Sequence, residues 1–453
     1  MMMMREVADV LHAEWNARDV LFTGVSTDSR TVKMGELFIA LKGDKFNGHE
    51  FVTEAEERGA VAVIVNQESG AKNKKSGIPL MLVKNTRLAL GQLAGHWRQR
   101  FAGSLIAVTG SNGKTTVKEM ITSILHQTVG EINNVLATEG NLNNDIGVPQ
   151  TLLRLRKQHV YAVIEMGMSS SSEISYLTKL AKPNIALITN AGLAHVGNFN
   201  SAEMVAHAKG EIFEGLDELS GIAVINTDDS YAPLWRKLAG GRQIVDFSLL
   251  QAAKVSANYQ LNMFDSQMIL KLPDGDEKID LQVPGEHNVR NALAAAAATV
   301  AMDIGKKSIA SGLGKFTGIN GRMQRKQCSH GATLIDDSYN ANPDSVRAAL
   351  AVLARIPGTR ILVIGDMGEL GRNSENFHSL IGKEARLMGV DKLLALGQLS
   401  QHSVLAFGTG AQHFKCIEDL LVAVKSLLAP NVTLLVKGSR FMQMERVVKK
   451  CEL

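Results

Sequence analysis

The segment AVTGSNGKTTVKEM, residues 107–120, places a glycine-containing loop between a predicted strand and a predicted helix. Residues 104–108, SLIAV, are apolar enough for a buried strand. Beyond the loop, apolar residues recur at helical spacing, as Val117, Met120, Ile121, Ile124 and Leu125. Backbone N–H groups and the positive end of a helix can hold phosphate groups in such a loop. The segment therefore predicts a phosphate-binding loop in an α/β fold.

Two side chains of the loop have the chemistry for a nucleoside triphosphate. Lys114 can neutralise the terminal phosphate, and the hydroxyl of Thr115 can ligate Mg²⁺. Val108 stands five positions before Gly113, where a Walker A motif has glycine. The pattern thus favours a shorter T-G-x-x-G-K-T loop over that of a common kinase or GTPase. The alternative is a chance glycine-rich turn, which the flanking strand and helix disfavour.

Length and composition limit the class of protein. A chain of 453 residues is expected to form about three domains. The net charge of +4 is a weak bias toward anionic ligands, and without basic runs interleaved with aromatic residues it does not predict nucleic-acid binding. The most apolar segment, residues 291–302, is shorter than the roughly 20 residues needed to span a bilayer, so no membrane insertion is expected.

The three cysteines, Cys328, Cys416 and Cys451, are far apart and lack metal-binding spacing. They therefore predict neither a disulfide framework nor a zinc site, which fits a reducing cytoplasm.

Three α/β regions follow one another along the chain, and we place their boundaries at 1–101, 102–318 and 319–453. Apolar runs predict strands in each region, and residues 243–283 alternate in the β manner around an Asp274-Gly275 turn. The predicted strands lie at 37–41, 61–65, 80–83, 104–108, 161–164, 185–189, 222–226, 332–337, 360–366, 392–397 and 432–439. Strands separated by helical patterns indicate largely parallel sheets.

Three residues near strand ends or in a helix are open to two interpretations. Glu165 is either a solvated acid or a second magnesium ligand, and the neighbouring phosphate loop favours the metal. His195 is as readily structural as metal-binding. Lys209, in a predicted helix, is by default a lysine that faces solvent.

Two polar segments of the second half of the chain are open in the same way. Asn288 and Asn291 are spaced to share one helical face, where their amides could read an adenine edge. In LIDDSYNANPDS, residues 334–345, Asp337 is well placed for ribose hydroxyls or a metal. Asp344 or Ser345 is expected to cap the helix that follows.

Together these segments resemble the Mur ligases, the ATP-dependent amide-bond ligases of peptidoglycan precursor synthesis. The resemblance rests on TGSNGKTT, AVIEMG, AKGEIF, GEHNVRNALAAAA, GR at 321–322 and DDSYNANPDS, in the family order. It implies an α/β fold of three domains: an N-terminal domain that holds the UDP end of the substrate, a central P-loop-type ATPase domain with a parallel sheet, and a C-terminal Rossmann-like domain that closes over the site.

The resemblance also implies roles for individual residues. Lys114, Lys209 and His195 are the implied catalytic residues. The implied ATP-binding residues are Gly110, Asn112, Gly113, Lys114, Thr115, Thr116, Asn288, Asn291, Arg322 and Asp337. Two magnesium ions are implied, with Thr115, Glu165, His195 and a carbamylated Lys209 as the metal-binding set. The implied substrate-binding residues are Ser26, Thr27, Asp28, Ser29, Arg30, Asn141, Asn143 and Asn144. Ala194 departs from the pattern, because several relatives carry an acid before the histidine.

Within the family, the resemblance is to the members that join D-alanyl-D-alanine to UDP-N-acetylmuramoyl tripeptide. It is carried by residues 27–51, by NLNNDIGVPQTLL, by DDSYNANPDS, and by VIGDMGELG with VKGSR. These two substrates, a cytoplasmic location and a monomer are what the resemblance implies. Two alternatives stay open: a family member that adds a diamino acid or glutamate, and a nucleotide-regulated binding protein without catalysis.

Overall fold

The computed structural model describes residues 1–43, 46–70, 77–192, 197, 199 and 201–452. It divides into two compact units. The first consists of Met1–Ala107, Glu131–Asn184 and Glu211–Gly221, and the second of Val108–Gly130, Ile185–Gly210 and Ile222–Leu453. The domain boundaries after residues 101 and 318 stay predictions.

The first unit contains a four-stranded parallel sheet of order β3-β4-β5-β6. Its strands are Val25–Ser26, Leu37–Ile39, Ala62–Asn66 and Leu80–Val83. The apolar runs at 37–41, 61–65 and 80–83 are therefore strands, as predicted. Two short strands, β1 and β2, pair antiparallel beside it. The other elements of residues 1–101 are β1 Met2–Met3, α1 Met4–Leu11, β2 Leu21–Phe22, α2 Val52–Glu57, α3 Gln67–Gly70 and α4 Thr86–Arg98.

Helix α4 connects this sheet to the rest of the first unit. It begins at Asn85, whose side chain accepts hydrogen bonds from the backbone N–H groups of Arg87 and Leu88. Along its length it packs against α6 and α7, and Arg87 forms an ion pair with Asp145. The remaining elements of the unit are β8 Val135–Ala137, α6 Gly147–Leu152, β9 Tyr161–Glu165 and α7 Glu173–Ala181. β8 and β9 are parallel.

Strand β7, Ser104–Thr109, begins in the first unit and ends in the second. In the second unit its last residue lies beside β10, because Thr189 N donates to Thr109 O at 2.9 Å. From β10 to β13 the strands are parallel, and β13, β14 and β15 form antiparallel pairs. They are Ile185–Ile188, Ile222–Asn226, Gln243–Ser248, Val255–Leu261, Ser266–Lys271 and Glu277–Leu281. The β structure predicted at 243–283, as an insert or an edge sheet, is confirmed: its strands continue this sheet to its edge strand β15.

The helix behind the phosphate loop is α5, Lys114–Val129, which packs against α10, Glu286–Val300, and α11, Lys306–Gly314. The run of alanines in α10 is buried, and small side chains allow the helices to approach closely. Helices α5 and α11 approach closely at Gly312, where an added Cβ would lie 2.4 Å from the Cα of Ile124. Helices α8, Ala202–Gly210, and α9, Ala232–Ala239, complete this part of the unit.

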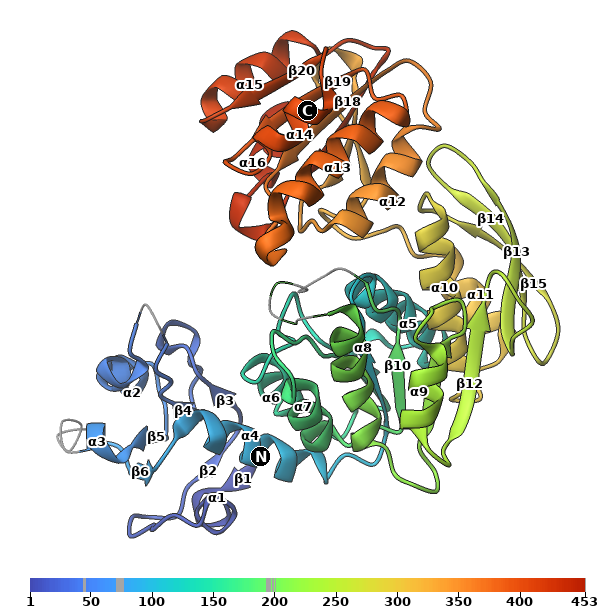
Figure 1. Ribbon diagram of the computed structural model, residues 1–453. Helices are drawn as coiled ribbons and strands as arrows, with labels where there is room; N and C mark the ends of the chain where they lie inside the picture. The colour runs from blue at the N-terminus through green and yellow to red at the C-terminus, as the bar shows by residue number, and fades with distance from the viewer. Residues whose placement is uncertain (44–45, 71–76, 193–196, 198, 200, 453) are drawn as a thin grey trace. The chain divides into compact units, whose positions relative to one another are not determined.

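Residues 324–451 form a six-stranded sheet of order β16-β17-β21-β18-β19-β20, parallel except for the edge strand β16. Helices α12 and α13 pack on one face of this sheet, and α15 and α16 pack on the other (Figure 1). A cluster of buried apolar side chains lies at each of these two interfaces. The strands are Gln324–Gln327, Thr333–Asp337, Val432–Lys437, Thr359–Gly365, Lys392–Leu396 and Ala411–Phe414. The helices are α12 Pro343–Leu353, α13 Ser374–Leu387, α14 Gln401–Phe407, α15 Ile417–Ser426 and α16 Glu445–Cys451. All four predicted strands are confirmed, and β16 and β20 were not predicted.

Candidate active site

The predicted phosphate loop lies between β7 and α5, and its two glycines are sterically required. Gly110 and Gly113 have φ angles of 150° and 82°. A Cβ on Gly110 would lie 1.8 Å from Oγ1 of Thr189, and one on Gly113 would lie 2.3 Å from Oδ1 of Asn291. Any other residue would clash at either position, so the glycines let the loop run close to β10 and α10.

Asn112 lies in the middle of the loop, and we call it the crest of the loop. Its backbone is hydrogen-bonded to the two residues that follow β10. Its N–H donates to Oδ1 of Asn190 at 2.9 Å, and its carbonyl accepts from Oγ1 of Thr189 at 2.7 Å. Lys114 lies over the loop, with Nζ 2.7 Å from the carbonyl oxygen of Gly110. Thr115 and Thr116 are buried in the first turn of α5. The loop is thus held in one conformation with Lys114 directly above it.

Lys209 is not a lysine that faces solvent. It lies in the last turn of α8 with 1% of its surface exposed. Burial, together with the positive charge of Lys114, lowers the pKa of Lys209 well below its ordinary value. The default interpretation of this residue from sequence is therefore wrong, because tertiary packing covers the side chain. A buried amine with a lowered pKa is unprotonated more often, and that form is nucleophilic.

Glu165 ends β9 in the first unit and is 2% exposed. Its Oε1 accepts a hydrogen bond from Nδ2 of Asn143 at 2.8 Å. Its other oxygen, Oε2, is buried and has no hydrogen-bond partner among the residues that the structure describes. An unpaired buried carboxylate oxygen is costly, and it is a hard ligand of the kind that Mg²⁺ prefers. The side chain therefore fits the predicted metal role.

The asparagines of residues 141–144 shape their own loop. Asn143 contacts Glu165, as described above. Oδ1 of Asn144 accepts from the N–H groups of Ile146 and Gly147, at 3.2 and 2.9 Å, where α6 begins. The carbonyl of Asn141 accepts from the N–H of Asn143 at 2.7 Å. The predicted contact of Asn141, Asn143 and Asn144 with a muramoyl peptide stays a prediction.

Asn288 and Asn291 share one face of α10, as their spacing predicted. Nδ2 of Asn291 donates to Oδ1 of Asn288 at 3.2 Å, and Nδ2 of Asn288 donates to the carbonyl of Pro284 at 2.8 Å. Both asparagines are buried. Because Asn291 also adjoins Gly113, this face of the helix meets the phosphate loop.

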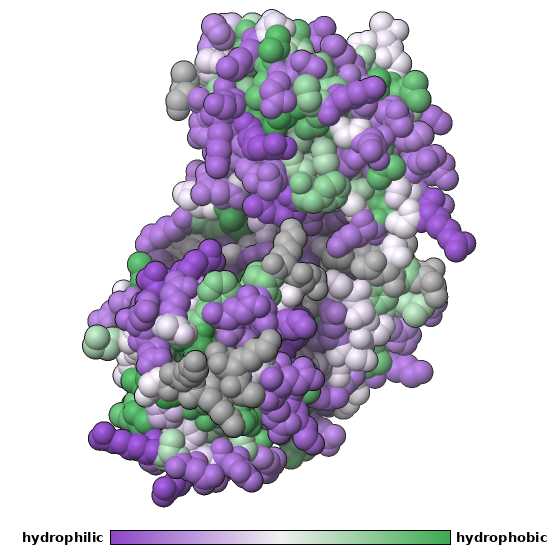
Figure 2. Space-filling view, turned by 90° about the vertical axis from the view of Figure 1, so that its left-hand side faces the viewer, coloured by the Kyte–Doolittle hydropathy of each residue, from purple (hydrophilic) through white to green (hydrophobic). Residues whose placement is uncertain are grey.

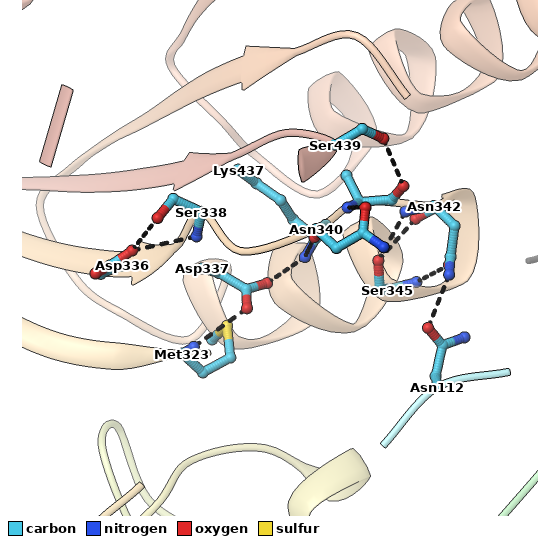
Figure 3. A network of polar contacts seen from close by, with 11 residues as sticks. Asn112, Met323, Asp336, Asp337, Ser338, Asn340, Asn342, Ser345, Lys437 and Ser439 are labelled. Carbon is cyan, nitrogen blue, oxygen red and sulfur yellow. Dashed lines mark hydrogen bonds and ion pairs between the residues drawn. The ribbon is translucent and has the colours of Figure 1, made fainter. Parts of the chain in front are cut away.

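Arg322 brings the part of the chain beyond residue 319 to the loop, and Asp337 is held within that part. Nη2 of Arg322 donates to Oγ1 of Thr115 at 2.9 Å, and its guanidinium lies over the ring of Tyr339, 4.4 Å from the centroid. Asp337 is buried between the N–H of Met323 and Nζ of Lys437, at 3.2 and 2.5 Å (Figure 3). Burial raises the pKa of Asp337, and Lys437 opposes that shift.

The cap of α12 differs from the prediction. Neither Asp344 nor Ser345 is the N-cap: Asn342 is, and its Oδ1 accepts from the N–H of Ser345 at 2.9 Å. Ser345 completes a capping box by accepting from the N–H of Asn342 at 3.0 Å. The helix begins earlier than predicted because Pro343, with its fixed φ, suits the first helical position.

Residues 26–30 form a compact turn in the first unit. Asp28 caps it, with Oδ1 accepting from the N–H of Arg30 at 3.0 Å, and the two side chains form an ion pair. Oγ of Ser29 donates to Glu54 at 2.9 Å, Oγ of Ser26 donates to the carbonyl of Asp28 at 3.0 Å, and Thr27 accepts from Gln150. Arg30 extends into solvent, with 78% of its side chain exposed. The predicted contact of this turn with a uridine diphosphate stays a prediction.

Comparison with known protein families matches three successive parts of the chain. The Mur ligase family catalytic domain matches residues 21–98, the Mur ligase middle domain 108–299, and the Mur ligase glutamate ligase domain 321–440. Among curated proteins, the UDP-N-acetylmuramoyl-tripeptide–D-alanyl-D-alanine ligase of Escherichia coli (strain K12) is 41% identical over 448 residues. The match covers 98% of this chain and 97% of the relative. The chain belongs to the Mur ligase family.

Other Mur ligases are similar to this chain along most of their length. The ligase of the same name from Bacillus subtilis (strain 168) is 35% identical, covering 94% of this chain and 92% of the relative. The crystal structure of MurF from Acinetobacter baumannii superposes with a TM-score of 0.89 at 34% identity, covering 98% and 97%. MurF from Thermotoga maritima, solved in complex with ADP, superposes with a TM-score of 0.83 at 26% identity, covering 96% and 98%. These matches confirm the predicted α/β fold and the resemblance to Mur ligases.

His195, predicted to bind a metal, and its neighbour Ala194 lie outside the described residues. Within the described part of the chain, no group of three or more histidine, cysteine, aspartate or glutamate side chains is arranged to hold a metal ion. Nor is any described helix long and apolar enough to cross a membrane. On the face seen in Figure 2, hydrophilic residues predominate and hydrophobic residues form small groups between them.

Three residues of this Mur ligase site were missed by the sequence analysis: Tyr339, Asn342 and Lys437. All three lie in segments that the analysis quoted, DDSYNANPDS and VKGSR. In the first segment only Asp337, Asp344 and Ser345 carried a prediction, and VKGSR entered only as part of the resemblance. The parallel pairing of β17 with β21 brings Asp337 opposite Lys437, and no local pattern reveals that pairing.

Proposed function

We propose that the chain is an ATP-dependent ligase that joins D-alanyl-D-alanine to UDP-N-acetylmuramoyl tripeptide. The observation that carries the proposal is the end-to-end match, at 41% identity, with the Escherichia coli ligase named for that reaction. The phosphate loop, with Lys114 above it and Arg322 bonded to Thr115, supports the use of ATP. The superposition with an ADP-bound MurF supports it as well.

In this proposal each part of the site holds one part of ATP. The N–H groups of the loop from Gly110 to Thr116 and the cation of Lys114 hold the phosphates. The amides of Asn288 and Asn291 face the adenine, Arg322 lies near the phosphates, and Asp337 contacts the ribose. The proximity of Asn291 to Gly113 supports this order along the nucleotide.

We propose two magnesium sites, with Thr115 and Glu165 at one and His195 at the other. The buried Oε2 of Glu165, which has no hydrogen-bond partner in the described part of the chain, supports the first. Bound magnesium would offset the negative charge that gathers on the phosphates as they react.

Lys209 supports the second site as a carbamate. The unprotonated amine attacks CO₂, a C–N bond forms, one C–O π bond breaks and one proton leaves, so that a neutral side chain becomes an anion near the charge of Lys114. The burial of Lys209 and its lowered pKa favour the unprotonated amine that this reaction needs.

The chemistry then proceeds in two displacements. A carboxylate oxygen of the tripeptide attacks the γ-phosphorus of ATP, which gives an acyl phosphate and releases ADP. Lys114 and Arg322 stabilise the negative charge that spreads over the transferring phosphoryl group. The amine of D-alanyl-D-alanine attacks the activated carbonyl, loses a proton, and inorganic phosphate leaves. Because water would hydrolyse the acyl phosphate, exclusion of water during this sequence is essential.

The N-terminal turn completes the proposal. Ser26, Thr27, Asp28, Ser29 and Arg30 receive the uridine diphosphate end, and the exposed guanidinium of Arg30, which pairs with Asp28 through Nε and Nη2, meets a phosphate through its remaining N–H groups. Asn141, Asn143 and Asn144 face the muramoyl peptide. We propose that the enzyme acts in the cytoplasm as a monomer, with domain boundaries after residues 101 and 318.

The proposal is tested with the purified full-length protein. It is mixed with ATP, Mg²⁺, D-alanyl-D-alanine and a UDP-N-acetylmuramoyl tripeptide that ends in either meso-diaminopimelate or lysine. Phosphate release that requires both substrates, with a product heavier by one dipeptide, is the expected result. ATP binding without turnover on either tripeptide would contradict the proposal and favour a family member with another amine substrate. A folded Lys209→Ala protein with full ligase activity would contradict the role of the lysine.

A further inference from the structure

The start of α12 is held in place by the neighbouring strand β21. Nζ of Lys437 donates to the carbonyl of Asn340 at 2.9 Å and to Asp337, and Oγ of Ser439 donates to the carbonyl of Ala341 at 3.1 Å. Lys437 and Ser439 are themselves buried. The carbonyl groups of the two residues before Asn342 therefore both accept hydrogen bonds, and these bonds fix the segment that leads into the helix (Figure 3).

Asn342 uses the two ends of its amide for two different tasks. Its oxygen caps α12 by accepting from Ser345 N at 2.9 Å, while its Nδ2 donates to Oδ1 of Asn112 at 2.8 Å (Figure 3). A residue needed only as a cap could be serine, threonine or aspartate, since each supplies the oxygen. The amide nitrogen of asparagine adds a hydrogen bond to the phosphate loop.

Asn112 is bonded on two sides. Its backbone N–H and carbonyl are used by Asn190 and Thr189 at the end of β10, which leaves its side chain to face α12. Gly192 lies close to the same helix, since a Cβ added to it would be 2.6 Å from Oδ2 of Asp344. The N–H of Gly192 donates to Oγ of Ser111 in the loop at 2.9 Å. The loop crest thus lies between β10 and the first turn of α12.

We infer that Asn342 is a positioning residue for ATP. Through Asn112 it holds the crest of the phosphate loop in the conformation that directs the loop N–H groups at the phosphates, so that Asn342 contributes to ATP affinity without touching the nucleotide. The inference rests on the proposed function in that ATP is the ligand. It concerns the binding step, which can be measured without ligase turnover.

The test is a double-mutant cycle on the affinity for a non-hydrolysable ATP analogue with Mg²⁺, measured by calorimetry. Asn342→Ser keeps the cap oxygen and loses the reach to Asn112, and it should weaken binding by roughly 3- to 10-fold, the net effect of one hydrogen bond. Asn112→Ala removes the acceptor and keeps the backbone bonds to β10. If the contact acts as inferred, Asn342→Ser in the Asn112→Ala background should weaken binding by less than about twofold.

Ser345→Ala is the matched control. It breaks the capping box but not the bond to Asn112, so it should lower the melting temperature and leave the ATP affinity within about twofold of wild type. In ligase kinetics, Asn342→Ser should raise KM for ATP more than it lowers kcat.

Additive effects in the cycle would overturn the inference, as would equal losses of affinity in Asn342→Ser and Ser345→Ala. A wild-type protein that binds the analogue but joins no peptide would refute the proposed function, and the cycle would still decide the role of Asn342. A wild-type protein that does not bind the analogue would refute both.

Discussion

The guanidinium of Arg322 donates a hydrogen bond to the hydroxyl of Thr115 at 2.9 Å. The two residues are 207 positions apart in the sequence. The ring of Tyr339 lies below the guanidinium and fixes its plane. An arginine held in this way is preorganised for a charge that develops at the phosphate loop.

Arg322→Ala should lower kcat for the ligase reaction by about 100-fold, because a preorganised donor at a developing charge is removed. Arg322→Lys should recover only part of the loss, since an ammonium group lacks the planar fork that stacks on Tyr339. Arg325 is the control. It stacks on Phe264 at 4.1 Å, and Arg325→Lys should leave the kinetics for ATP unchanged. Steady-state rates measure all three, and equal effects at both positions would contradict the assigned role.

Glu165→Gln should raise the Mg²⁺ concentration needed for half-maximal activity by about tenfold or more. The substitution removes the negative charge and keeps an oxygen to accept from Asn143. Proteins bind Mg²⁺ mainly through anionic oxygens, so the substitution should weaken Mg²⁺ binding. The measurement is a magnesium titration of the ligase rate, with circular dichroism to show that the fold is retained. An unchanged titration curve would exclude Glu165 as a ligand.

Protonation of His287 should lower the free energy of unfolding in mild acid. Burial, with the positive charges of Lys437 and Arg290, lowers its pKa from 6.5 to about 4. Between these pH values the unfolded chain binds a proton that the folded chain does not, so stability is complete above pH 6.5 and is lost as the pH falls toward 4. The loss is on the order of 2–3 kcal/mol.

The check is the unfolding free energy at several pH values for wild type and His287→Gln. The variant should lose less stability than wild type between pH 6.5 and 4. Other buried histidines contribute to the wild-type curve, so the difference between the two proteins isolates His287. Two parallel curves would contradict the prediction.

Gly312→Ala should destabilise the protein by about 1–3 kcal/mol. The added Cβ would lie 2.4 Å from the backbone of Ile124 in α5, so α5 or α11 must shift. At Gly314, in the same helix, an added Cβ would have no atom of the described residues within 4 Å, and Gly314→Ala should be neutral or slightly stabilising. Denaturant unfolding compares the pair. Equal effects would mean that the two helices approach less closely than described.

Most of the strands could be predicted because their apolar runs are long and buried on both faces, as in β7, β18 and β21. The edge strands β16 and β20 could not. β16 reads QRKQ and β20 AQHF, and neither has an apolar run, because an edge strand has only one neighbour and is more exposed. The cap of α12 was misplaced for a local reason: DSYNANPDS offers several capping residues, and Pro343 decides among them.

The sequence by itself determined the phosphate loop, the α/β character and the residues able to bind phosphate and metal, because these depend on chemistry and spacing within short segments. Only the tertiary structure decided which of those residues meet. It buries Lys209 within the electrostatic influence of Lys114, leaves one oxygen of Glu165 without a hydrogen-bond partner among the described residues, and directs the amide of Asn342 at Asn112. These relationships arise from strand pairing and helix packing between distant segments. Burial and electrostatic environment are properties of that packing, and no local pattern encodes them.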